Sequence, residues 1–341
     1  MTRAMTVVLA VGFLAWAPYP MQAGVPSSYT VQTIGAANSG TQALDINNSG
    51  QVTGSSRDRG FIWQQGVLTQ LPTLPNAYQA YGYRINGLGQ VAGVCDATSQ
   101  SSTGHAVLWS GGTITDIGQT RSEAFGINDK GVVVGVDYDA GMLAASWDHG
   151  VKTYLSTSSG SFAEAINNKG QVCGKAGGRI VIWKDGVTTD LGLGSGAGKD
   201  INDLGQVCGV YAPTQPNVWH GYLWDPVKGC TDICYGGNVT ETWGLNNLGQ
   251  VVGYYYPLGD FYNDKPFLWD NGTFYDLNAL IPAGSGVTLY RVFGINDLGQ
   301  IVGDTRDERG FVLTPVPEPA TLALLALGGA LALLRRRSAS A

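Results

Sequence analysis

The chain has 341 residues, 44% of them hydrophobic, which is enough for one large core or two smaller ones. Only 13% of the residues are charged and the net charge is -6, which excludes a nucleic-acid surface built from clustered Lys and Arg. The 50 glycines follow no every-third-residue period, so a collagen-like fibre is excluded and many short strands joined by tight turns are predicted.

The first 23 residues predict a secretory signal peptide. Residues 1–3 are a short basic start, and residues 4–17 form an almost unbroken apolar run. Pro18 and Pro20 end any helix, and Ala23 is a small residue at the expected cleavage point. A buried N-terminal helix is the alternative, but the three parts occur in the order of an export signal. We therefore expect an exported protein.

Residues 24–314 contain a unit that recurs seven times. Its core reads Ile-Asn-x-x-Gly-Gln-Val-x-Gly with small variations, and the copies are 35 to 50 residues apart, a range typical of propeller blades. Asn followed three residues later by Gly predicts a type I turn whose last residue is left-handed, with a strand on each side. The repeated residues are Asn47, Asn86, Asn128, Asn167, Asn202, Asn246 and Asn296.

The repeated Asn side chains have two interpretations. Each is expected to cap its own turn by bonding to the backbone two residues on. The alternative is a ring of oxygen ligands around a cation, helped by Asp129, Asp203 and Asp297. Turn chemistry accounts for every copy, so we favour the structural role and expect no metal.

Each repeat continues with two more predicted strands. The third strand ends in Trp63, Trp109, Trp147, Trp183, Trp224 or Trp269, and the last copy has Leu313 instead. A fourth strand follows every Trp, but the last copy runs into the tail without one. Residues 29–35 have the fourth-strand pattern, so they are expected to complete the last repeat and to hide its edge.

These observations predict an all-β fold, a seven-bladed β-propeller of four-stranded blades that is closed by an N-terminal strand. An open β-solenoid is the alternative, although solenoid rungs are usually shorter and need no strand from the other end of the chain. The repeated Trp residues are expected to pack between blades, and stacking on sugars is the alternative.

Part of the repeat resembles a known family. Residues 104–109 read Gly-His-Ala-Val-Leu-Trp and resemble the extracellular HAF repeats, named for a His-Ala-Phe before the Trp strand. Residues 220–224 are a looser match, and other copies replace the His, so His105 is not expected to be a required ligand. The resemblance covers nearly the whole mature chain and implies an extracellular repeat domain.

The longer connections of the repeat are expected to share one face and to carry the binding site. Variable loops on a rigid frame are where binding usually lies, and aromatic rings offer flat faces to sugars or proteins. The alternative is that these rings merely cover the ends of the blades. The candidate residues are Tyr81, Tyr83, Trp219, Tyr254, Tyr255, Tyr256, Phe261 and Tyr262.

No motif for an enzyme or a cofactor stands out. The chain has no Gly-x-Ser-x-Gly, no Walker loop and no His-Glu-x-x-His, so we expect no catalytic residue and no cofactor. A carboxylate pair drawn from different blades is the enzymatic alternative. The available acids are Glu123, Asp137, Asp139, Glu164, Asp260 and Asp264. Five cysteines leave the disulfide pairing open.

The tail, residues 315–341, predicts a membrane segment. Val316, Pro317, Glu318 and Pro319 precede an apolar run at residues 320–334, which is followed by Arg335, Arg336 and Arg337. A helix of this length covers about 23 Å, short of the bilayer core of about 30 Å, but flanking residues and local thinning accommodate the difference. The three arginines stay cytoplasmic, so the repeats are expected to lie outside.

This order of Pro-Glu-Pro, short apolar helix and Arg cluster resembles the PEP-CTERM sorting signal. The resemblance implies an exosortase-type membrane enzyme and the secretion machinery as partners. It also implies a Gram-negative host that makes exopolysaccharide and biofilm, and an inner-membrane-tethered precursor that becomes a cell-surface or extracellular protein. We therefore expect a non-enzymatic surface protein that binds exopolysaccharide or other surface proteins. The alternative is a secreted polysaccharide-active hydrolase or lyase.

Overall fold

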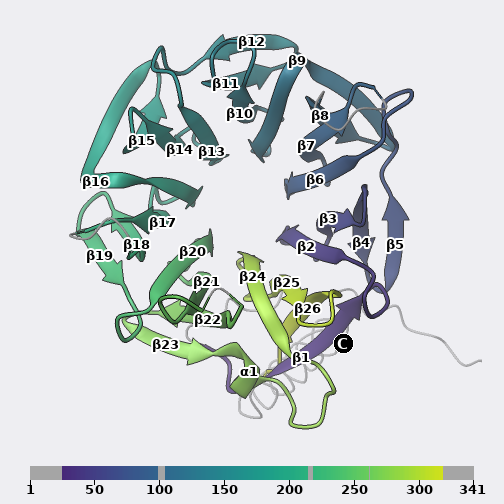
Figure 1. Cartoon of the computed structure of the whole chain (residues 1–341), viewed down its shortest axis with the longest axis vertical. Coiled ribbons are helices and arrows are strands. Elements are labelled where there is room, and N and C mark those ends of the chain that lie inside the picture. Colours follow the sequence, from purple (N-terminus) through teal and green to yellow (C-terminus); the bar gives the residue numbers. More distant parts are fainter. Residues whose placement is uncertain (1–24, 99–103, 214–217, 261, 318–341) are drawn as a thin grey trace, which may run out of the picture.

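The computed structural model describes residues 25–98, 104–213, 218–260 and 262–317. These residues are almost entirely antiparallel strands, and α1 (Leu277–Leu280) is the one helix in the described part of the chain. The strands are arranged radially around a central opening (Figure 1), so the fold is all-β and propeller-like. The predicted fold class is confirmed at this level.

Each repeat supplies its strands in the predicted order from the centre outwards. In five repeats the innermost strand is separate from the outer strand of the preceding repeat. These strands are β2 (Thr41–Ile46), β6 (Ala80–Ile85), β13 (Phe162–Ile166), β20 (Val239–Leu245) and β24 (Leu289–Ile295). The second strands are β3 (Val52–Ser56), β7 (Val91–Asp96), β10 (Val133–Asp137), β14 (Val172–Ala176), β17 (Val207–Tyr211), β21 (Val251–Tyr256) and β25 (Ile301–Thr305).

The two outer positions of each repeat complete its sheet. The third strands are β4 (Arg59–Gln64), β8 (Gly104–Ser110), β11 (Leu143–Asp148), β15 (Arg179–Lys184), β18 (His220–Asp225), β22 (Lys265–Asp270) and β26 (Gly310–Pro315). The short outer strands are β5 (Val67–Gln70), β12 (Val151–Tyr154), β19 (Gly229–Ile233) and β23 (Thr273–Asp276).

Two long strands join neighbouring repeats and change the predicted sheet pattern. β9 (Thr113–Ile127) pairs with β8 through its first half and with β10 through its second half. β16 (Val187–Ile201) pairs in the same way with β15 and then with β17. The result is two sheets of seven strands where separate four-stranded sheets were expected. The connection between outer and inner strand is short enough here to stay extended, so no loop interrupts the ladder.

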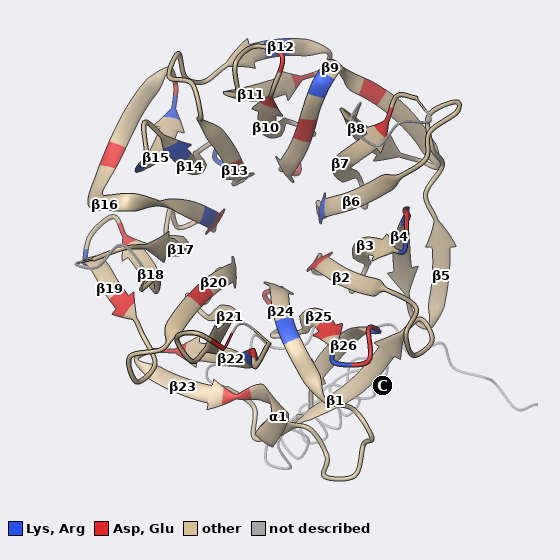
Figure 2. Cartoon of the chain, in the orientation of Figure 1, with Lys and Arg blue, Asp and Glu red and all other residues tan. Residues whose placement is uncertain are grey.

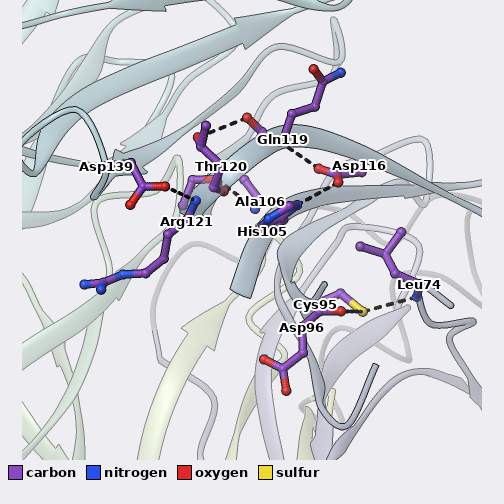
Figure 3. A network of polar contacts seen from close by, with 12 residues as sticks. Leu74, Cys95, Asp96, His105, Ala106, Asp116, Gln119, Thr120, Arg121 and Asp139 are labelled. Carbon is purple, nitrogen blue, oxygen red and sulfur yellow. Dashed lines mark hydrogen bonds and ion pairs between the residues drawn. The ribbon is translucent and has the colours of Figure 1, made fainter. Parts of the chain in front are cut away.

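The bend of β9 is stabilised by side chains (Figure 3). Gln119 has a φ of 55°, and its backbone N–H donates to Oδ1 of Asp116 at 2.9 Å. The other carboxylate oxygen of Asp116 lies 2.7 Å from Nδ1 of His105 on β8. Arg121 then donates its N–H to Asp139 at 3.0 Å. The His of the HAF-like segment therefore fixes a strand bend.

The N-terminal strand lies in the last repeat. β1 (Tyr29–Ile34) pairs antiparallel with β26, from Tyr29 opposite Pro315 to Ile34 opposite Gly310. β2 of the first repeat packs against β24 and β25 of the last one. Ser28 accepts a hydrogen bond from the N–H of Val316 at 3.0 Å. Both ends of the described chain therefore lie side by side.

The cores lie between neighbouring sheets, as the repeated Trp residues show. Trp109 and Trp147 are 2% exposed, and Trp63 packs against Val302 and Val312 of the last repeat. The strand-end Trp residues that are buried in this way have no free ring face for a sugar, so their role is core packing.

Candidate ligand-binding cavity

The Asn turns form a continuous hydrogen-bond ring on the short-turn face. In each turn the Asn Oδ1 accepts from the backbone two and four residues on, as Asn167 does from Lys169 and Gln171 at 3.1 and 2.9 Å. The Nδ2 donates to the carbonyl oxygen of the next repeated Asn, from Asn47 to Asn86 and onwards until Asn296 donates back to Asn47. The capping is what turn chemistry predicts, and the link between repeats was not foreseen.

A second ring lies just outside the first. In six of the seven turns the residue after the repeated Asn donates its backbone N–H to the side chain of its counterpart, for example Asp129 to Asn168 and Asn168 to Asp203, both at 2.8 Å. The carboxylates of Asp129, Asp203 and Asp297 are thus occupied as acceptors of protein hydrogen bonds. Among the described residues no group of three metal-binding side chains occurs.

A β-bulge interrupts every innermost strand three residues before its Asn. In β20 the pairing passes from Thr242 opposite Gly253 to Gly244 opposite Val252, which leaves Trp243 unpaired. The other innermost strands show the same irregularity at the same position. The bulged residues are Leu44, Tyr83, Phe125, Glu164, Lys199, Trp243 and Phe293. Bulges re-aim side chains, and they are common next to binding sites.

The second Gly of the repeat explains why these bulges form. A Cβ added to Gly253 would lie 2.0 Å from the carbonyl oxygen of Glu241, and the corresponding glycines are equally close to a carbonyl. Only Gly permits the inner strand to approach this closely. The repeat motif therefore encodes the bulge as well as the turn.

All seven bulged side chains line one cavity of about 570 Å³ at the centre of the variable-loop face. Phe162, Lys175, Tyr254 and Arg291 add to its wall. The rings are close to one another, since the centroid of Phe125 lies 5.9 Å from that of Tyr83. The wall therefore combines six aromatic rings with five charged groups, and aromatic rings with a small number of placed polar groups are typical of ligand pockets.

The charged groups of the cavity are held in fixed positions. Lys199 donates to Glu164 at 3.1 Å, and its Nζ also lies 5.0 Å from the ring of Trp243. Arg291 bonds Asp264 at 2.5 Å and lies 5.2 Å from the ring of Tyr254. Glu164 is the one carboxylate among the described residues that line the cavity.

Arg84 lies between the cavity and the Asn turns. Its guanidinium donates to the carbonyl oxygen of Lys199 at 3.1 Å and lies 3.7 Å from Asp45 and 3.9 Å from Asp200. The charged inner ends of β2, β6 and β16 accordingly face the central opening (Figure 2). Burial raises the pKa of Asp45 to about 6, although Arg84 acts in the opposite direction. This ion cluster joins repeats on different sides of the opening.

A cleft of about 510 Å³ adjoins the cavity on the same face. It lies between the first and last repeats, and it shares Gln42 and Arg291 with the cavity wall. Tyr262, Tyr290, Asp304 and Arg306 are among its other residues. The ring of Tyr290 lies between Arg291 at 5.0 Å and Arg306 at 5.3 Å.

The predicted aromatic residues divide into three groups. Tyr83 and Tyr254 line the cavity, and Tyr262, which is 80% exposed, lines the cleft. Tyr81 stacks on Tyr83 with centroids 6.5 Å apart, and Tyr256 donates to Glu241 at 3.2 Å, so both lie behind the wall. Tyr255 packs against Phe267 and lies away from the cavity.

Two further points correct the prediction. Tyr81, Tyr83 and the residues Tyr254–Tyr256 belong to strands β6 and β21, where loops were expected. Trp219 precedes β18 and accepts a hydrogen bond from Thr240 at 2.9 Å, and Phe261 lies outside the described residues.

Sequence reasoning missed most of the cavity. Phe125, Phe162, Trp243 and Phe293 were not singled out, nor were Arg84, Lys199 and Arg291 as binding groups. A signal was present, because the position three residues before the repeated Asn is large in every copy. Alternation along a regular strand does not identify it, since the bulge changes which residues share a face.

The candidate acids do not assemble into one site. Glu123 accepts from Tyr83 at 3.5 Å and from Tyr138 at 3.2 Å, and burial raises its pKa. Asp137 bonds Lys152 at 2.6 Å, and Asp264 is paired with Arg291. All five cysteines are free thiols, three of them buried.

The sorting motif begins where the domain ends. Val316 is hydrogen-bonded to Ser28, and Pro317 is the last described residue. The predicted signal peptide, the apolar run at 320–334 and the three arginines lie outside the described residues. No helix in the described ranges is long and apolar enough to cross a bilayer.

Comparisons with known proteins support the tail and the fold. Residues 315–338 match the PEP-CTERM protein-sorting motif. This motif indicates an exported protein that is sorted at its C-terminus from a membrane-anchored precursor. No curated protein sequence matches the chain significantly.

Solved structures resemble the chain in fold alone. A catalytically inactive virginiamycin B lyase from Staphylococcus aureus, crystallised with quinupristin, has a TM-score of 0.57 at 13% identity and covers 84% of this chain and 100% of its own. A chain of the mitotic checkpoint complex has a TM-score of 0.50 at 14% identity and covers 91% and 100%. The WD40 β-propeller domain of Doa1 has a TM-score of 0.41 at 12% identity and covers 86% and 98%.

Proposed function

We propose that the described domain is a closed seven-bladed β-propeller. Three observations support closure: β1 pairs with β26, β2 packs against β24 and β25, and Asn296 is hydrogen-bonded to Asn47. Each seven-stranded sheet then counts as two blades that share one long strand. Closure leaves no long sheet edge free for aggregation.

Deleting residues 29–35 tests this closure. The last blade would lose its outer strand and expose β26, so the truncated protein should unfold or form oligomers. Size-exclusion chromatography with light scattering and a thermal melt measure both effects. A monomer with an unchanged melting temperature would contradict the closed ring.

We propose further that this propeller is a non-enzymatic binding protein of the cell surface or extracellular matrix, associated with exopolysaccharide or biofilm. The observation that carries this proposal is the set of bulges, which direct one side chain from every innermost strand into a single aromatic cavity. Aromatic faces stack on the apolar faces of sugar rings, and the fixed charges give specificity.

The enzymatic alternative receives less support from the geometry. Glycoside hydrolysis needs two carboxyl groups on either side of the scissile bond. The described wall of the cavity contains one, Glu164, and Lys199 neutralises it. A binding role needs no second acid. An exosortase-type enzyme would process the tail after the domain has crossed the membrane.

Binding of exopolysaccharide fragments from the native host tests the proposed function. Trp243→Ala should weaken binding by about tenfold or more, because truncating an aromatic residue that anchors a partner commonly costs about 2 kcal/mol or more. Leu88→Ala is the matched control, since Leu88 is 71% exposed on the short-turn face. Release of reducing ends by the purified domain would instead favour the hydrolase or lyase.

A further inference from the structure

The cavity and the cleft are adjacent hollows on the variable-loop face. Gln42 and Arg291 belong to both walls. Together they extend from the bulged residues of the innermost strands to Thr305, Arg306 and Glu308 of the last repeat. A ligand that fills both the cavity and the cleft must be elongated, so a molecule with a single small ring is too short.

One cation in each hollow lacks a carboxylate partner among the described residues. Lys175 makes one described contact, with its Nζ 4.5 Å from the ring of Phe162. Arg306 donates to the carbonyl oxygen of Tyr262 at 3.0 Å and stacks on Tyr290. The neighbouring Lys199 and Arg291, by contrast, are each held by an acid.

The lack of a carboxylate partner at these two cations contrasts with the overall charge of the chain, in which acidic residues outnumber basic ones. The protein has 26 acidic and 20 basic residues, so carboxylates are available to neutralise a surface Lys or Arg. A cation held on an aromatic face, without a carboxylate partner, is suited to bind an anionic group beside a ring.

We propose that the ligand is a polysaccharide whose sugars carry carboxylate groups, a uronate polymer, and that one carboxylate binds Lys175 and another binds Arg306. This inference rests on the proposed function and names its ligand class. β14, which carries Lys175, and β25, which precedes Arg306, lie on opposite sides of the central opening (Figure 1). The polymer therefore spans several sugar units across the face, with its rings on the aromatic residues between the two cations.

A neutral glucan does not account for these cations. Its hydroxyls bond equally well to neutral side chains, so two unpaired cations would add no affinity. Nucleic acid is a poor fit because the net charge of -6 repels a phosphate backbone.

Calorimetric titration with oligogalacturonates of increasing length, and with cello-oligosaccharides as the neutral probe, tests the proposal. Lys175→Met and Arg306→Met remove the charge and keep the aliphatic stem. Each variant should weaken long oligogalacturonates by about tenfold, which is the effect of losing one charge-assisted hydrogen bond of about 1.4 kcal/mol. A disaccharide reaches one cation, so it should respond to one of the two variants.

Lys228→Met is the matched control, since Lys228 is exposed on a turn of the opposite face. Added salt should weaken the oligogalacturonates and leave the neutral probe unchanged. Equal binding of neutral and charged oligosaccharides, unaffected by Lys175→Met and Arg306→Met but lost in Trp243→Ala, would overturn this inference and leave the proposed function standing. Failure of every oligosaccharide to bind would overturn both.

Discussion

Asn296 donates its side-chain N–H to the carbonyl oxygen of Asn47 at 3.0 Å, although 249 residues separate the two in the chain. The same bond joins every repeated Asn to the next, and each Asn is at most 6% exposed. One amide thus stabilises its own turn through Oδ1 and the neighbouring turn through Nδ2. An isosteric change separates these two roles.

Asn296→Asp should strongly destabilise the domain at neutral pH. It replaces the Nδ2 donor with an oxygen that faces two acceptors, the carbonyl of Asn47 and Oε1 of Gln300. A buried charge without a partner costs about 3–5 kcal/mol, and urea denaturation should show a loss of that order in the free energy of unfolding. Asn76→Asp at an exposed left-handed turn is the control and should stay within about 0.5 kcal/mol. Equal effects of both changes would mean that the ring bond contributes nothing.

Gly87→Asn should stabilise the domain. Gly87 follows the repeated Asn of its turn and has no side chain, so the N–H of Asn48 lacks the acceptor that its counterparts have. An Asn would supply that acceptor and add about 0.5–1.5 kcal/mol, measured as a higher urea midpoint. The new Cβ would lie 2.9 Å from the movable Oδ1 of Asp129. Gly87→Ala adds the Cβ alone, and a rise as large as that for Asn would rule out the missing bond as the cause.

Gly253→Ala should remove the bulge at Trp243 or unfold the domain. The methyl group would clash with the carbonyl of Glu241 at 2.0 Å, and overpacking of backbone costs about 3 kcal/mol or more. Gly111→Ala meets nothing within 4 Å at a φ of 57°, so it should cost only the left-handed penalty of about 1–2 kcal/mol. Thermal melts of the two variants give the comparison. Similar melting temperatures would show that the inner strand does not need this close approach.

Asp304→Asn should stabilise the domain above neutral pH. Burial raises the pKa of Asp304 to about 6 from an ordinary value of 3.8, and its Oδ1 has no hydrogen-bond partner among the described residues. A raised folded-state pKa means that the contribution of this group to stability is full below pH 4 and is lost as pH rises through 6. The variant, which cannot ionise, should gain on the order of 2 kcal/mol over the native chain at pH 8.

Urea titrations of the native chain and Asp304→Asn between pH 4 and 8 measure this difference. It should grow from near zero at the acid end and level off above pH 7. A difference that shrinks as pH rises would reverse the assigned direction of the pKa shift.

Replacing Pro317, Glu318 and Pro319 with alanine should leave the protein in the membrane of its native host. The apolar run and the three arginines would remain, so hydrophobicity and the positive-inside bias still hold the chain. The unaltered chain should instead yield exported protein that lacks residues 320–341. Mass spectrometry of the C-terminal peptide distinguishes the retained variant from the processed native chain. A peptide containing Leu334 in fully exported native protein would refute processing at the motif.

The sequence alone determined the local parts of this protein. The turn needs an Asn acceptor and a left-handed Gly within four residues. The positive φ that this requires occurs at all seven turn glycines, Gly50, Gly89, Gly131, Gly170, Gly205, Gly249 and Gly299. Both partners of each turn lie in one short segment, so the repeat and the strand order could be read from it. The N-terminal strand was recognised because residues 29–35 have the fourth-strand pattern that the last repeat lacks, although its partner β26 is far away in the chain. The sorting motif is equally local.

Only the tertiary structure decided which side chains meet at the centre. Trp243 faces the cavity because Gly253, on the paired strand, permits the bulge, and the pattern of either strand alone does not reveal this. Arg84 lies near Asp200 because the fold brings distant repeats together. It also donates to the carbonyl oxygen of Lys199, which is 115 residues away in the chain. Pairing between strands of different repeats is long-range, so the cavity and its charges follow from the assembled repeats and from no single copy.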